Sequence, residues 1–541
     1  MMSTTTTTVT WRHTLPLSVA AIVLLWGYLH YNQGFAVDDS YITFRYAQNA
    51  LAGHGFVFNV GQHYYGSTAT GYAMLLAGIV KLLGCFHILV DVPQVSTFLS
   101  GVAVAAMAWV AGRACLWSGS LVNQAGSVLV AAFIAMLPLS SAVSAHETYA
   151  FTAALAIGSY LVVMRRALVF GTLLFVVAMT LRPDSLLFVI VQFTGLAFVL
   201  WVSPVTSHYS WRRLLAAVVI LVAGMLAWII AMKLYYGTFF PGTMDAKKAQ
   251  VQMGYWPLFK LSTVTTALDQ LFAGRYWLLL LLPAVCCLYI FLRRAKAVAG
   301  RILHISPALL MSAVWALFAV GVVCAYIVFH VTLWTWYVVP IGFSLLLSAV
   351  YGINALASSG NYVPASASAS ASASANANAN GMPWAAAVAV FVVTVGLALT
   401  PRMDQQAHYY FTGKNVNGHL TSYDPIMWYL KKHEPDGTSV AIAEPGTFGY
   451  KLGPAYQVLD VLGLASPGVA KALRKGDFNY TVRTWQPKYV VTSWQGRYNP
   501  DQQPGFTDSY ELVGEFKEPY WDVLLKHGAM LYRRKDAPAS R

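Results

Sequence analysis

Two adjacent acids, Asp38 and Asp39, stand just after an apolar run, Leu15 to Tyr31, that is typical of a membrane crossing. An ionised carboxylate at a membrane–water boundary could take a proton from a weakly acidic hydroxyl group, which is general-base chemistry. One acid could equally act as the N-cap of a following helix. A cap needs only one carboxylate, so the doubled acid favours a chemical role for the other.

The stretch that follows the acids predicts a helix from Ser40 to about Leu51, ended by Gly53 and Gly55. One face of this helix carries Tyr41, Arg45 and Gln48. It is amphipathic and too polar to cross a bilayer. We therefore expect it to lie on the membrane surface beside the first span.

The composition is that of a polytopic membrane protein with some soluble mass. Of the 541 residues, 57% are hydrophobic and only 10% are charged, whereas soluble domains carry about 25% charged residues. Apolar runs of sufficient length predict about eleven or twelve spans. The net charge of +14 does not indicate nucleic-acid binding, because the basic residues occur as short pairs at the ends of apolar runs.

Those basic pairs orient the chain. Placing Arg165/Arg166 and Arg212/Arg213 on the cytoplasmic side puts every unusual polar stretch, the double acid included, on the opposite face. One feature does not fit this orientation. Four apolar segments lie between the loop that carries the two acids and the pair at Arg165. Because the loop and Arg165 are assigned to opposite sides of the membrane, the number of crossings between them must be odd. One segment between Thr68 and Glu147 is therefore not a full span.

We expect two domains. Residues 1–400 form the membrane domain, with a first outer loop at 32–67 and a flexible Ala-Ser/Ala-Asn linker at 359–382. Residues 401–541 contain the short β-like runs SVAIAE, KYVVTSW, YELVGEF and DVLLKHGAMLYRR, which predict a small extracytoplasmic α/β domain.

The first loop, DDSYITFRYAQNALAGHGFVFN followed by GQHYYGSTATGY, resembles that of a large bacterial family of polytopic sugar transferases. Later stretches resemble landmarks of the same family in the same order. They are RPD at Arg182–Asp184, YYG-x-x-x-P-x-T at Tyr235–Thr243, W-x-WY at Trp334–Tyr337, and G-x-x-GY with D-x-x-GL at Gly446–Leu464. The chain departs where it has PGTMDAKK and YGST in place of PN-x-x-x-AK and EG-[YS]-T.

This family resembles the GT-C superfamily, which includes the mycobacterial terminal arabinofuranosyltransferases and the protein mannosyltransferases. The resemblance implies a GT-C-like fold and an inverting transferase of class EC 2.4. Such an enzyme moves a sugar, with arabinofuranose as one candidate, from a polyprenyl-phosphate donor to a cell-envelope glycan, lipid or protein. It would work at the extracytoplasmic face of the inner (plasma) membrane.

The resemblance also implies site residues. Asp38 is the expected general base, and Asp39 would orient the acceptor or hold a divalent cation, Mg²⁺, Mn²⁺ or Ca²⁺. A lipid-phosphate leaving group needs positive charge beside it. The candidates for binding the donor phosphate are Arg182, Arg45 and Lys247. The candidates for contacting the sugar or the acceptor are Tyr41, His54, Glu147, Trp336 and Tyr337.

Plainer roles stand beside these assignments. Arg182 could simply pair with Asp184 at the membrane interface, Arg45 could bind lipid headgroups, and the aromatic residues could be ordinary interface anchors. Rival functions are a mannosyl or aminoarabinosyl transferase of the same class, a transporter of lipid-linked sugars, and a glycan-binding protein. A transporter usually shows an internal repeat, which the sequence lacks. No phosphate-binding loop motif supports a nucleotide donor.

Overall fold

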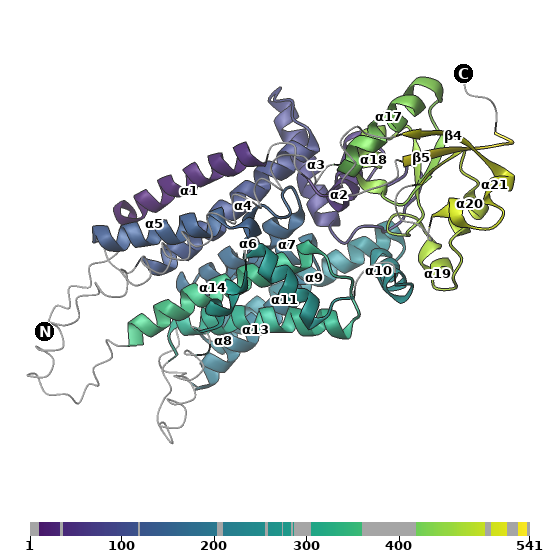
Figure 1. Cartoon of the computed structure of the whole chain (residues 1–541). Helices are drawn as coiled ribbons and strands as arrows, with labels where there is room; N and C mark the ends of the chain where they lie inside the picture. The colour runs from purple at the N-terminus through teal and green to yellow at the C-terminus, as the bar shows by residue number, and fades with distance from the viewer. Residues whose placement is uncertain are drawn as a thin grey trace, which may run out of the picture.

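A computed structural model describes residues 10–32, 36–116, 120–202, 209–254, 258–272, 274–282, 285, 305–359, 418–492, 499–516 and 529–537. A bundle of helices carries a small domain containing a sheet at one end (Figure 1). The expected linker at 359–382, beyond its first residue, and the expected span from Trp384 lie outside the described residues.

Seven described helices are long and apolar enough to cross a membrane, which makes the chain a multi-pass membrane protein. They are α1 (Trp11–Tyr31), α4 (Val92–Cys115), α6 (Glu147–Ser159) with its π-helical continuation η2 (Tyr160–Met164), α8 (Ser185–Val202), α9 (Trp211–Tyr236), α13 (Pro307–Val328) and α14 (Thr335–Ser359). Three shorter apolar helices are α3 (Thr70–Cys85), α5 (Leu121–Met136) and α7 (Leu168–Leu181). The described residues thus hold fewer full-length spans than the number expected from hydropathy.

The short helix α2 (Asp38–Leu51) differs from expectation at its start. Asp38 and Asp39 are its first two residues, and the N-cap position belongs to Val37, which has no side-chain cap. The expected N-cap role of the acids is therefore wrong. The expected end is confirmed, because Gly53 and Gly55 follow the helix with φ angles of 85° and 81°.

The position of α2 also differs from expectation. Figure 1 shows α2 between the bundle and the C-terminal domain, and most of its residues are buried. It packs against α3 on one side and against α18 (Pro445–Leu452) of the C-terminal domain on the other. Contacts with protein on both sides take the place of the membrane surface that its amphipathic pattern suggested.

The helix α3 accounts for the excess apolar segment before Arg165. Its 16 residues measure about 24 Å, as do the 16 residues of α5, so the positions of its two ends and not its length identify it. It begins next to Ala69 at the end of the bundle that carries the C-terminal domain. The next helix, α4, begins at the same end, where Tyr450 of that domain hydrogen-bonds to the Val92 backbone. Because α3 and the loop after it begin and finish at the same end of the bundle, α3 is not counted as a crossing. The helices α4, α5 and α6 then make three crossings before Arg165, which is the odd number that the orientation requires.

Three further short elements pack against described helices. They are α10 (Thr243–Gln252), which packs against α19 (Val469–Leu473) of the C-terminal domain, and α11 (Leu261–Leu271) and the 3₁₀ helix η3 (Arg275–Leu280), which pack against α14. A 3₁₀ turn, η1 (Pro138–Ser140), precedes α6.

The C-terminal domain contains a five-stranded sheet in the order β2-β1-β3-β5-β4. The strands are β1 (Ser439–Ile442), β2 (Gln457–Asp460), β3 (Tyr489–Thr492), β4 (Tyr510–Phe516) and β5 (Ala529–Arg534). β1 runs parallel to β2 and β3, whereas β5 is antiparallel to β3 and β4. The helical elements are α17 (Gly418–His433), α18, α19 (Val469–Leu473), α20 (Tyr480–Trp485), η5 (Pro500–Gln502) and α21 (Phe506–Ser509). This confirms the expected small α/β domain, to which the structure adds β2.

Labelling of Cys85 tests the placement of α3. In a variant without the other four cysteines, we expect Cys85 to react with a membrane-impermeant maleimide from the side that labels a Ser509→Cys variant of the C-terminal domain. An Arg213→Cys variant, at the start of α9, should react only from the opposite side. Labelling of Cys85 from the Arg213→Cys side would show that α3 crosses the membrane.

Candidate active site

A polar cavity of about 410 Å³, including the part open to solvent, lies where the bundle meets the C-terminal domain. Its walls come from the start of α2, the loop before α3, the starts of α6, α10 and α14, and the turn after β2. The charged, imidazole and large aromatic side chains of its lining are Asp39, His146, Glu147, Arg182, Lys247, Trp336 and Tyr337. Residues from seven separate segments of the sequence, including Arg182 at the end of α7, therefore line one space.

Asp39 and Lys247 form one charged pair in this cavity. The Asp39 carboxylate lies 3.6 Å from Lys247 Nζ, and the same ammonium group donates a hydrogen bond of 2.9 Å to the Tyr337 hydroxyl. Burial lowers the pKa of Lys247, but Tyr337 and Asp39 outweigh that effect and raise it above its ordinary value. Lys247 is therefore a permanent positive charge beside Asp39.

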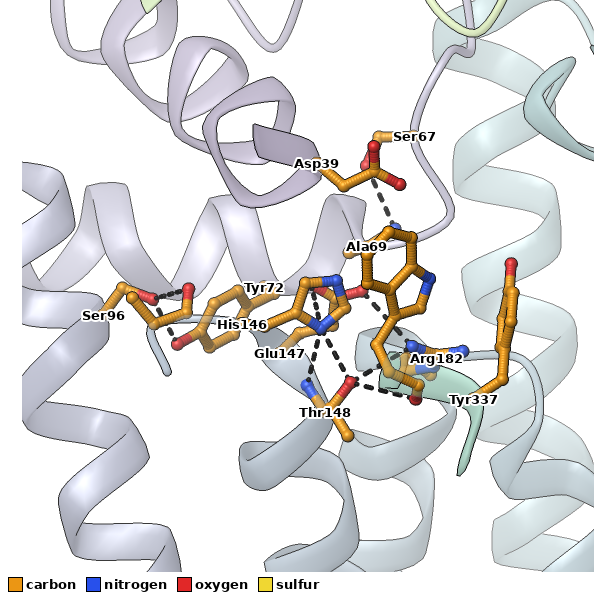
Figure 2. A network of polar contacts seen from close by, with 12 residues as sticks. Asp39, Ser67, Ala69, Tyr72, Ser96, His146, Glu147, Thr148, Arg182 and Tyr337 are labelled. Carbon is orange, nitrogen blue, oxygen red and sulfur yellow. Dashed lines mark hydrogen bonds and ion pairs between the residues drawn. The ribbon is translucent and has the colours of Figure 1, made fainter. Parts of the chain in front are cut away.

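Arg182 and Glu147 form a second charged pair. Arg182 Nη1 lies 3.7 Å from Glu147 Oε1 and donates to the Thr148 hydroxyl at 3.3 Å. The other side of the guanidinium donates to Asp184 Oδ2 from Nε at 3.0 Å and from Nη2 at 2.6 Å. The ion pair with Asp184 thus exists, and it fixes the guanidinium at the cavity wall. Figure 2 shows Glu147, Thr148 and Arg182 below Asp39.

Aromatic rings line the cavity beside the two charged pairs. Trp336 stacks on the His146 imidazole, with ring centroids 5.5 Å apart, and on Trp334 at 4.8 Å. Both cations face rings, since Arg182 lies 5.3 Å and Lys247 5.1 Å from the Tyr337 ring centroid. Such contacts hold the two charges in place without neutralising them. His146 is a lining residue that was not among the expected site residues.

Asp38 does not line the cavity. Its carboxylate accepts hydrogen bonds from the Thr447 N–H at 2.8 Å and the Gly446 N–H at 3.3 Å, at the start of α18. These N–H groups have no partner inside their own helix, and the positive end of the helix dipole favours a carboxylate. Asp38 therefore connects the first loop to the C-terminal domain.

Arg45 is also outside the cavity, and it is completely buried. Its guanidinium donates to the carbonyl oxygens of Phe58 and Tyr456, each at 2.7 Å, and to that of Gly449. No acid pairs with it among the described residues; backbone carbonyls from the first loop and the C-terminal domain satisfy it instead. Its position is that of a connector between the two parts.

The remaining expected residues lie apart from the cavity as well. Tyr41 packs against Phe44 and against Tyr450 of the C-terminal domain, with ring centroids 5.1 and 5.5 Å apart. His54 is exposed in the turn after α2. Asn59 lies further along the same loop, and its side-chain amide exchanges two hydrogen bonds of 2.9 Å with the Val458 backbone of β2, which joins the first loop to that strand.

These contacts explain the tail motif G-x-x-GY. A Cβ atom on Gly446 would lie against the Asp38 backbone and 2.7 Å from its Oδ2, and one on Gly449 would lie 3.2 Å from Arg45. Glycine is needed at both positions because the first loop approaches so closely. The first-loop motif and the tail motif are thus two sides of one interface.

The donor set does not fit a divalent cation. Among the described residues, no three His, Cys, Asp or Glu side chains gather as a metal-binding group. Asp39 faces Lys247 and Glu147 faces Arg182, so each carboxylate already has a cationic partner.

Comparison with known proteins places this geometry in a fold. Residues 413–535 match the model of a domain of unknown function, DUF8728. The oligosaccharyltransferase of Archaeoglobus fulgidus in its apo form superposes with a TM-score of 0.51 at 12% identity, over 93% of this chain and 73% of that one. The chain has a GT-C fold.

Two other solved structures are similar to the chain. The same oligosaccharyltransferase tethered to an acceptor peptide gives a TM-score of 0.50 at 12% identity, over 98% and 76% of the two chains. ArnT from Cupriavidus metallidurans, bound to undecaprenyl phosphate, gives 0.45 at 13% identity, over 96% and 97%.

One curated relative is similar in sequence. The terminal beta-(1->2)-arabinofuranosyltransferase of Mycobacterium tuberculosis is 38% identical over 65 residues, which are 12% of this chain. The match spans about a tenth (10%) of that relative's length.

A Gly446→Ala substitution tests the close approach of α18 to the first loop. The added methyl group would overlap the Asp38 backbone, and overpacking of this kind costs about 1–3 kcal/mol. We expect thermal unfolding of the purified protein at a lower temperature and earlier protease release of the C-terminal domain. Gly78→Ala in α3 is the matched control, because no atom lies within 4 Å of its added Cβ. Equal behaviour of the two variants would contradict the interface.

The pH dependence of this interface tests Asp38. Burial, together with the nearby Glu444 carboxylate, raises the pKa of Asp38 from 3.8 to about 7. A folded-state pKa above the unfolded value stabilises the folded state fully below pH 3.8, and this contribution is lost as the pH rises through about 7. We expect the C-terminal domain to become protease-sensitive at a lower temperature at pH 8.5 than at pH 5.5. Asp38→Asn should reduce this difference; an undiminished difference would assign it to another group.

Proposed function

We propose that the chain is an integral membrane glycosyltransferase that moves a sugar from a polyprenyl-phosphate donor to a cell-envelope acceptor. The observation that carries this proposal is one carboxylate, Asp39, facing a polar cavity beside two fixed cations, Lys247 and Arg182. A base and a phosphate-binding charge that face the same cavity are what this transfer requires. The GT-C fold supports the same class of reaction.

In this mechanism Asp39, rather than Asp38, is the general base. Asp39 accepts the proton of the acceptor hydroxyl as its oxygen forms a bond to the anomeric carbon of the donor sugar. The bond from that carbon to the phosphate oxygen breaks on the opposite side, with inversion. The polyprenyl phosphate leaves as a monoester with one additional negative charge, which Lys247 and Arg182 stabilise. Both the base and the phosphate-binding cations come from the lining of the cavity, so neither role needs Asp38.

The aromatic wall and Glu147 position the reactants. Trp336 and Tyr337 offer flat faces on which a sugar ring can stack, and Tyr337 also contacts Lys247. Glu147 stands 3.7 Å from Arg182 and orients its guanidinium, so it acts on the donor phosphate through that residue.

The active face is proposed to be extracytoplasmic. The basic pairs Arg165/Arg166 and Arg212/Arg213 lie at the end of the bundle opposite the cavity, and such pairs mark the cytoplasmic side. The C-terminal domain then lies outside with the cavity. The named activity of the mycobacterial relative supports arabinofuranose as the transferred sugar.

A transfer assay tests this function. The parent chain, Asp39→Asn and Asp38→Asn are incubated in membranes with radiolabelled polyprenyl-phosphate pentoses and hexoses. We expect transfer of one sugar, a loss of about 10²–10⁴-fold in rate for Asp39→Asn, and a smaller loss for Asp38→Asn, because asparagine still accepts N–H bonds. Equal insertion of all three proteins is the control.

Two outcomes would contradict the proposal. If no sugar were transferred from any of the lipid-linked donors, the proposal that the chain is a glycosyltransferase using such donors would be wrong. If Asp38→Asn were inactive and Asp39→Asn active, the general base would be Asp38, which is the assignment that the family resemblance alone implies.

A further inference from the structure

A second hollow lies far from the candidate active site. Its volume is about 1480 Å³, which, as for the first cavity, includes the part open to solvent, and it runs between α1, α4 and the end of α6 with η2. None of its lining residues belongs to the first cavity. Most of its lining is apolar, and α1, which forms one wall, is only lightly packed, with 11% of its apolar window buried. We call this hollow the α1 groove.

The α1 groove has the length of one membrane leaflet. Its α1 wall extends from Trp11 to Leu25, which is about 21 Å at 1.5 Å per residue. Its α4 wall extends from Val102 to Arg113, or about 16 Å. Half of a bilayer core measures roughly 15 Å, so one extended acyl chain matches the groove.

Two arginines stand at one end of the groove. Arg113 and Arg165 both line it, at the end of the bundle opposite the catalytic cavity. Arg113 donates one hydrogen bond, of 2.9 Å, to the Leu116 carbonyl, and neither side chain has an acidic partner among the described residues. An external anion can therefore approach both guanidinium groups.

The sequence explains why no acid pairs with these arginines. No Asp or Glu occurs among residues 1–37, 92–146, 148–183 or 185–244. The acids that interrupt these ranges, such as Glu147 and Asp184, lie at the opposite end beside the catalytic cavity. The positive charge at the mouth of the groove is thus uncompensated by the neighbouring helices.

Local structure adds two features suited to a lipid. Trp11 and Trp109 line the groove, and tryptophan is enriched where headgroups meet the hydrocarbon. Tyr160, which starts the π-helical turn η2, packs edge-on against Trp109 with centroids 6.1 Å apart. Such π-helical turns occur often at functional sites.

We propose that the α1 groove binds an anionic phospholipid, with its phosphate at Arg113 and Arg165 and one acyl chain between α1 and α4. The occupant comes from the leaflet at the Arg165 end. A polyprenyl-phosphate donor is a different ligand, because its phosphate is needed beside Lys247 at the other end of the bundle. The bound lipid fills the space that leaves α1 lightly packed.

Lipid binding to the purified full-length chain tests this site. Delipidated protein is titrated with phosphatidylglycerol, phosphatidylcholine or undecaprenyl phosphate, and bound lipid is counted by native mass spectrometry. We expect phosphatidylglycerol to bind most tightly and Arg113→Gln/Arg165→Gln to lose at least about tenfold in affinity. The matched control is Arg212→Gln/Arg213→Gln, which removes equal charge at the same end and should change affinity less than about twofold.

A second variant keeps the result interpretable if the double arginine variant unfolds. Ala106→Phe fills the groove and leaves both arginines in place, so it should release the lipid while thermal unfolding stays cooperative. The proposal is overturned if phosphatidylcholine or undecaprenyl phosphate binds as tightly as phosphatidylglycerol. It is also overturned if the control loses as much affinity, or if Ala106→Phe retains the lipid.

Discussion

Neighbouring residues of an α-helix point about 100° apart, and this constraint divides the work of Asp38 and Asp39. At the start of α2 one carboxylate faces the C-terminal domain and the other faces the cavity. A single acid could not reach both. The adjacent pair therefore lets one helical turn hold the domain in place and present a free carboxylate oxygen to a substrate.

The interface that Asp38 begins is completed by Arg45 and Asn59. A buried guanidinium without an acidic partner is costly unless its donors are satisfied. Here the carbonyls of Phe58, Gly449 and Tyr456 satisfy it, and they come from both sides of the interface. Removing either side leaves unpaired polar groups, so the first loop and the C-terminal domain depend on each other. The end of α9 joins the same loop, because the hydroxyls of Tyr235 and Tyr236 hydrogen-bond to the Phe56 backbone.

The sequence predicted what depends on local pattern. Hydropathy indicated the bundle, β-like runs indicated the C-terminal sheet, and glycines marked the end of α2. Because motifs far apart in the chain resemble one family, their convergence on one cavity could also be expected for Glu147, Arg182 and Lys247. The parity of the basic pairs showed that one apolar segment does not cross, and the structure identifies it as α3.

The roles of Asp38, Arg45 and His146 depend on contacts with residues far away in the sequence, and no local pattern predicts such contacts. Arg45 looks like a phosphate or headgroup ligand from its helix face, yet it contacts residues about 400 positions away in the chain. Asp38 looks like a cap of its own helix but accepts from the start of another one. His146 lines the cavity with Trp336 stacked on its ring, and nothing in the sequence near His146 predicts that contact.

The most direct test of the account is an experimental structure of the chain with a polyprenyl-phosphate sugar bound. We predict that the donor phosphate lies within hydrogen-bond distance of Lys247 or Arg182, and that the anomeric carbon faces Asp39 with room for a hydroxyl between them. Asp38 should remain on the N–H groups of Gly446 and Thr447. A phosphate bound elsewhere, or an Asp38 carboxylate turned toward the sugar, would contradict the division between the two acids.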